Sequence, residues 1–181
     1  MKNREKIRNM THIALYSIML TVCSWLSVPL AVPITLQTFG VFFILFYAGG
    51  KKALASLLLY IALGAIGLPV FSGFGNGMSV LVGPTGGYIL GFLAAGAVYF
   101  AAEAIFKEGM SKRWVKYCVA TVALFACYAL GALGVIKYAS DSALGYFEVF
   151  FGSVAAYGIA DALKIVSAEL LCSYIRKYVK A

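Results

Sequence analysis

Apolar residues run along the chain in six blocks, separated by short polar, basic or glycine-rich segments. The blocks predict helices at residues 9–28, 36–48, 53–71, 84–106, 114–136 and 149–175. A helix that crosses the roughly 30 Å hydrocarbon core needs about 20 apolar residues. Only the block at 36–48 is clearly shorter, about 20 Å long at a rise of about 1.5 Å per residue. The pattern predicts an all-α fold: a six-transmembrane-helix bundle with a short second helix.

Composition supports an integral membrane protein with little soluble material attached. The 181 residues are 62% hydrophobic and 12% charged, with a mean hydropathy of +0.91. Soluble domains are about 45–50% apolar and about 25% charged. We therefore expect residues 1–181 to form a single membrane domain, whose first apolar block is retained rather than cleaved as a signal peptide.

The basic residues test both the number of helices and their direction. With six crossings, all 15 lysines and arginines except Lys137 and Lys164 fall on one side. Lys137 shares the other side with Asp141 and Glu148. Cytoplasmic loops of membrane proteins are enriched in Lys and Arg, so we expect a multi-pass protein of the cell membrane with both termini in the cytoplasm. The same clustering explains the net charge of +8 without a nucleic-acid partner.

Two stretches on the outer side carry no charge, at residues 27–38 and 71–87. Uncharged, glycine-dense backbone is typical of segments that pack over a bundle or line a cavity. We expect the second stretch to form a Gly-rich lid loop between the third and fourth helices, with an ordinary mobile loop as the alternative. Small residues at positions 83, 87, 91 and 95 predict close helix packing inside the bundle, in preference to dimerisation.

Asp161 and Lys164 are the main candidate binding residues. They lie one helical turn apart within the last apolar block, so their side chains leave the same face of the helix. Each ionised group costs about 2.5–3.5 kcal/mol at a helix centre in the bilayer. We expect them to face inward and bind a ligand; the alternative is a buried ion pair that only fixes helix packing.

Five polar or aromatic residues complete the candidate site: Asn76, Gln37, Thr35, Tyr88 and Tyr157. Asn76 lies between two glycines, a pattern equally typical of a tight turn. Thr35 and Gln37 open the short helix as caps or cavity residues, and the tyrosines either line a cavity or lie at the membrane interface.

Outside this site, the acidic residues and the histidine are expected to be structural. Glu103 is expected to pair with Lys107 at the membrane interface, Glu169 to contact a partner or extend to the interface, and His12 to be interfacial.

The sequence contains no residue pattern typical of a catalytic site or a metal site. His12 is the only histidine, and the four cysteines form no CxxC pair, so no zinc or haem site is expected. Asp161 and Lys164 lack a nucleophile with a matched base, so we expect neither an enzyme nor a resident cofactor. No P-loop is present either. Active transport would therefore require another protein to supply ATP.

Four stretches form a recognisable set: VPITLQTFGV at 32–41, YIALGAIGLPVFSG at 60–73, GPTGGYILGF at 83–92 and DALK at 161–164. In this order they resemble the BioY family. BioY proteins are the biotin-specific substrate-capture, or S, components of energy-coupling-factor (ECF) transporters. The resemblance implies six helices, an outward-facing vitamin site closed by the loop between helices 3 and 4, and high-affinity biotin uptake. It also implies partners, namely a membrane coupling subunit and two cytoplasmic ATPase subunits.

The resemblance places the family's acidic and basic helix-6 positions on Asp161 and Lys164, and its lid-loop polar contact on Asn76. One feature departs from the S components, which often carry an Ala-xxx-Ala ridge on helix 1. Here Ala14 is followed by Ile18 instead.

Biotin, as the transported ligand, has two orientations open to it. Its ureido group can meet Asp161 and Lys164, or Lys164 can meet its carboxylate. The alternatives in function are an S component for another vitamin, a solitary proton-coupled carrier and an intramembrane enzyme.

Overall fold

A computed structural model describes residues 2–30, 32–107, 109–138 and 145–179. Asp141 and Lys180, which contribute to the charge pattern, lie outside these ranges. The helices and strands are α1 (Lys2–Trp25), β1 (Ser27–Val28), β2 (Ile34–Thr35), α2 (Gln37–Ala48), α3 (Gly50–Ala65), η1 (Ser72–Phe74), α4 (Met78–Val82), α5 (Gly86–Phe106), η2 (Gly109–Ser111), α6 (Arg113–Tyr138) and α7 (Tyr146–Val179).

The six predicted helices correspond to α1, α2, α3, α5, α6 and α7. The all-α prediction needs one correction, because β1 and β2 pair as a small antiparallel hairpin between α1 and α2. The third helix ends at Ala65 rather than at residue 71. Gly67 has φ +100, a left-handed conformation that stops a helix, and the Phe71 ring folds back against Gly64. The segment between α3 and α5 also contains the additional short helix α4.

Among the described residues, three helices are long and apolar enough to cross a membrane: α5, α6 and α7. The α2 helix is apolar but only 12 residues long. The α1 helix begins in the charged N-terminal segment, which lowers its mean hydropathy.

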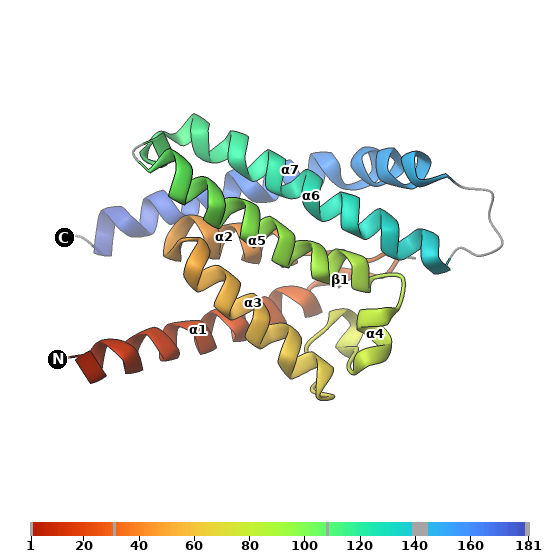
Figure 1. The fold of residues 1–181 in the computed structure, drawn as a ribbon, viewed down its shortest axis with the longest axis horizontal. Coiled ribbons are helices and arrows are strands. Elements are labelled where there is room, and N and C mark those ends of the chain that lie inside the picture. Colours follow the sequence, from red (N-terminus) through yellow and green to blue (C-terminus); the bar gives the residue numbers. More distant parts are fainter. Residues whose placement is uncertain (1, 31, 108, 139–144, 180–181) are drawn as a thin grey trace.

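The helices α5, α6 and α7 run roughly along the long axis of the bundle, whereas α3 is inclined and crosses α1 (Figure 1). The start of α1 and the end of α7 lie at the same end of the bundle. The most extensive packing is between α5 and α6, followed by α2 against α7, α1 against α3 and α3 against α5. The core between them is apolar and aromatic, with Tyr60, Tyr99, Phe42 and Phe71 nearly inaccessible.

The α5–α6 contact depends on small residues, as the spacing predicts. A Cβ added at Gly91 would lie 2.7 Å from the Cys127 carbonyl oxygen, and one at Gly87 would lie 2.9 Å from the Cα of Gly134. The two backbones therefore approach closely inside one bundle, which confirms packing as the use of these glycines. Gly83 does not belong to this ridge, because it caps the end of α4.

The corner between α2 and α3 is completed by charged side chains from two other helices. The Gly50 N–H, at the start of α3, donates to Glu103 Oε2 of α5 at 2.8 Å. At the end of α2, Arg176 of α7 donates to the carbonyl oxygens of Phe46 and Tyr47. Each charge satisfies backbone groups that a helix end leaves unpaired. The prediction that Glu103 pairs with Lys107 is wrong, since no ion pair joins these two described residues.

Candidate functional site

A pocket of about 120 Å³ lies between the helices and the uncharged stretches at residues 27–38 and 71–87. We call it the central pocket. It is lined from α7, α6, α5, the start of α2 and the two outer stretches. The lining residues are Val32, Pro33, Ile34, Thr35, Gln37, Thr38, Phe71, Ser72, Val80, Thr85, Tyr88, Ile89, Phe92, Leu124, Cys127, Tyr128, Tyr157, Asp161 and Lys164.

Asp161 is the centre of the polar part of the pocket. Asp161 is only 5% exposed, and each of its two carboxylate oxygens accepts a hydrogen bond. Lys164 Nζ lies 2.8 Å from Oδ1, and the Tyr128 hydroxyl donates to Oδ2 over 2.7 Å. An ion pair and a short hydrogen bond together offset the cost of burying this charge.

The charged pair retains bonding capacity toward the pocket. A carboxylate offers about four lone-pair positions and an ammonium offers three N–H donors. Each carboxylate oxygen has one donor in the structure, and Lys164 donates once to Asp161. The lysine side chain is 16% exposed, and both residues line the cavity. The arrangement can therefore accept from N–H groups of a ligand and donate to its carbonyl or carboxylate oxygen.

Gln37 forms a second polar group, on the first turn of α2. Its Nε2 donates to the Tyr60 hydroxyl at 2.7 Å, which fixes the direction of the amide. Its Oε1 lies 3.3 Å from the Thr35 hydroxyl. The Gln37 backbone N–H donates to that hydroxyl at 3.2 Å, so Thr35 binds the first backbone N–H of α2 as well as lining the pocket, although the N-cap position is Leu36.

The two predicted tyrosines line the pocket and connect its walls. The Tyr88 hydroxyl is 2.6 Å from Ser153 Oγ, which joins α5 to α7. The Tyr157 hydroxyl donates to the Val32 carbonyl at 3.1 Å. Tyr157 therefore joins α7 to the outer stretch that precedes β2.

Asn76 is the predicted site residue that the structure does not bring to the pocket. It is exposed, between η1 and α4, and is not among the lining residues. Gly77, which follows it, has φ +80. The local backbone thus agrees with the turn interpretation of this Gly-Asn-Gly sequence.

Glu169 lies on the same helix as Asp161 but outside the pocket. It is 3% exposed and pairs with Arg113 Nε of α6 at 3.4 Å. The Tyr117 hydroxyl lies 3.3 Å from its Oε2. Glu169 is therefore paired within the bundle, a partner that the sequence prediction did not identify.

Sequence reasoning missed Tyr128, Tyr60 and Ser153, the partners of the predicted polar residues. A signal existed for Tyr128, because a phenol in the middle of an apolar helix needs an acceptor when it is buried. No group of three or more potential metal ligands occurs in the part of the chain that the structure describes.

Fold and site together define a class of protein: an apolar helical bundle with a small, mostly apolar pocket and a buried charged pair at its side. The BioY family model matches residues 1–181. The chain belongs to the BioY family.

Relatives match almost over their full lengths. A biotin transporter BioY of Thermotoga maritima is 36% identical over 94% of this chain and 97% of its own. A probable biotin transporter BioY of Pyrococcus horikoshii is 29% identical over 94% of this chain and 98% of its own. The fold is similar to the crystal structure of the S-component for biotin from an ECF-type ABC transporter. That match has a TM-score of 0.83 at 23% identity, covering 98% of this chain and 95% of the other.

Proposed function

We propose that this chain is a biotin transporter component that binds biotin in the central pocket. The observation that carries the proposal is the Asp161–Lys164–Tyr128 cluster, which borders an otherwise apolar cavity in a member of the BioY family. The relatives named above are a biotin transporter and a probable biotin transporter, and the chain, as a member of this family, is not an enzyme.

The chemistry of biotin fits the lining residues. Its fused rings and valeryl chain are apolar and suit walls that include Ile89, Phe92 and Leu124. Its ureido group offers two N–H donors and one carbonyl acceptor. Asp161 accepts from the N–H groups, while Lys164 donates to the carbonyl. The carboxylate end then lies toward the outer stretches, where Asn76 remains a proposed contact of the closed lid.

The size of the pocket supports a lid. Pockets for small ligands usually have volumes of about 300–1,000 Å³, whereas the central pocket has about 120 Å³. A ligand the size of biotin therefore needs the walls to move apart. The outer stretches at 27–38 and 71–87 supply Val32, Thr35, Phe71, Ser72 and Val80 to the lining, and we propose the second of them as the lid.

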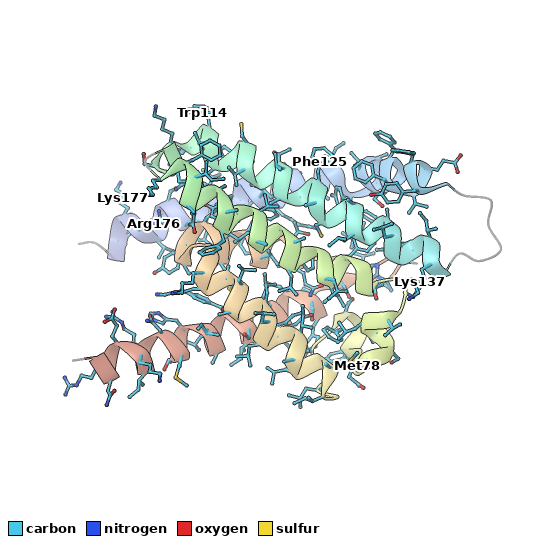
Figure 2. The ribbon with its side chains drawn as sticks, in the orientation of Figure 1. Met78, Trp114, Phe125, Lys137, Arg176 and Lys177 are labelled. Carbon is cyan, nitrogen blue, oxygen red and sulfur yellow. The ribbon has the colours of Figure 1, made fainter. Side chains whose placement is uncertain are left out.

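The proposed topology has six spans, with both termini in the cytoplasm. Lys137 lies at one end of the bundle, and Trp114, Arg176 and Lys177 lie at the other (Figure 2). The basic end is the cytoplasmic one by the enrichment of Lys and Arg in cytoplasmic segments. The α2 helix then crosses as a short segment whose outer end is sheltered by protein.

Energy for uptake is proposed to come from an ECF module, consisting of a membrane coupling subunit and two ATPase subunits. The chain has no P-loop of its own. The likeness in fold to the S-component for biotin supports this assignment.

Isothermal titration of the purified full chain tests the proposal. We expect stoichiometric binding of biotin that excess thiamine or riboflavin does not displace. Displacement by either vitamin would instead indicate an S component of different specificity. Biotin uptake into vesicles that contain this protein alone would indicate a solitary carrier.

A further inference from the structure

A second cavity lies on the periphery of the helical bundle, away from the central pocket. It is a groove of about 660 Å³ between the last turns of α5 and the first turns of α6. We call it the α5–α6 groove. Small residues form part of its surface, including Ala101, Ala102 and Cys118, and larger ones such as Ile105 and Phe106 flank them. No residue lines both cavities.

The groove is apolar along its length and basic at one end. Its described lining contains Lys112 and no carboxylate. Lys107 directly follows the lining residue Phe106 at the end of α5. Within the described residues neither lysine is in an ion pair. Glu108, between them in sequence, lies outside those residues.

The length of the groove along α6 is close to the thickness of the hydrocarbon part of one bilayer leaflet. Trp114 to Val122 of α6 covers about 12 Å at about 1.5 Å per residue, and half of the hydrocarbon core is about 15 Å. Trp114 is 65% exposed and lies at the basic end of the bundle (Figure 2). Tryptophan side chains are enriched at the membrane–water interface, at the level of the headgroups. The position of Trp114 therefore places the basic end of the groove beside the headgroups.

We propose that the α5–α6 groove binds an anionic phospholipid of the leaflet that contains this end of the bundle. One acyl chain lies along the apolar surface, and the phosphate lies beside Lys112 and Lys107. Basic pockets between helices on the cytoplasmic side bind anionic headgroups. Each lysine near an anionic membrane surface strengthens binding by about fivefold. The exposed apolar side chains Ile105 (72%) and Phe106 (53%) then contact lipid tails.

Fluorescence of Trp114 reports on this site directly. The chain has two tryptophans, so the signal of Trp114 is the part lost in Trp114→Phe. The full-length protein is placed in phosphatidylcholine vesicles that contain a small, equal fraction of either brominated phosphatidylglycerol or brominated phosphatidylcholine. We expect the phosphatidylglycerol to be enriched at Trp114 by about fivefold or more at low salt, with the preference falling at high salt.

Two pairs of variants separate the groove from general surface charge. Lys107→Gln/Lys112→Gln should abolish the preference, whereas Lys51→Gln/Lys52→Gln, in the first turn of α3, should retain it. Ala101→Phe fills the groove with both lysines intact and should also abolish it. The same change at the exposed Ala155 of α7 should not. Biotin binding of each variant shows that it is folded.

Equal quenching by both brominated lipids in the parent protein would overturn the proposal. A preference that survives in Ala101→Phe would also overturn it, since lipid would then associate with the charges and not with the groove. Neither result bears on biotin binding, which is measured separately.

Discussion

Replacing Gly91 by alanine tests the close approach of α5 and α6. The added Cβ would lie 2.7 Å from the Cys127 carbonyl oxygen, 2.8 Å from its Sγ and 2.9 Å from its Cα. Two of these three atoms are backbone, so the neighbour cannot simply rotate away. Overpacking of this kind costs about 1–3 kcal/mol, and the better helix propensity of alanine returns about 0.5–1 kcal/mol. The net prediction is a loss of up to about 2.5 kcal/mol in the free energy of unfolding.

Gly152 of α7 is the matched control. It is exposed, and a Cβ added there meets no atom within 4 Å. Gly152→Ala should therefore stabilise the protein by about 0.5–1 kcal/mol through helix propensity alone. Unfolding in detergent micelles, followed by circular dichroism, should shift in opposite directions for the two variants. Equal shifts of the same sign would refute the proposed backbone contact between α5 and α6.

Three further predictions concern the pocket and the α2–α3 corner. Tyr128→Phe removes one of the two donors to Asp161 and should weaken biotin binding, measured by titration, by up to about tenfold; an unchanged affinity would exclude an orienting role for this hydroxyl. Lys164→Met should leave the ratio of affinities for biotin and biotin methyl ester within about twofold of the parent ratio. The reason is that Lys164 is proposed to meet the ureido group and not the carboxylate. If the variant instead lost a preference of the parent for biotin over the methyl ester, the reverse orientation would be supported. Glu103→Gln should lower the free energy of unfolding by about 0.5–1.5 kcal/mol, because Gly50 loses a charged acceptor, while biotin affinity stays the same; a stability equal to that of the parent would show that this cap contributes nothing.

The sequence was most informative where burial of charge is costly. Asp161 and Lys164 in an apolar block predicted an inward-facing pair, and the structure places both against the central pocket. Small residues at four-residue spacing likewise predicted the α5–α6 packing at Gly87 and Gly91. Both signals are strong because the bilayer penalises a charge and rewards close backbone contact.

The details that sequence could not supply depend on contacts between distant segments. At the end of α3, the left-handed Gly67 is accompanied by the return of Phe71 onto Gly64, a contact that apolar periodicity does not record. The partner of Glu103 is a backbone N–H 53 positions away, not the lysine one turn along its own helix. Asn76 has the same local sequence whether its loop covers the pocket or turns at the surface.

The central claim is that the Asp161 carboxylate binds biotin in the central pocket. Titration of biotin into Asp161→Asn, beside Glu169→Gln as a buried carboxylate of the same helix outside the pocket, tests it most directly. A hydrogen bond to a charged group contributes about 1.5–3 kcal/mol, so Asp161→Asn should bind biotin at least about tenfold more weakly. Glu169→Gln should bind like the parent. Folded Asp161→Asn protein with the affinity of the parent would contradict the account.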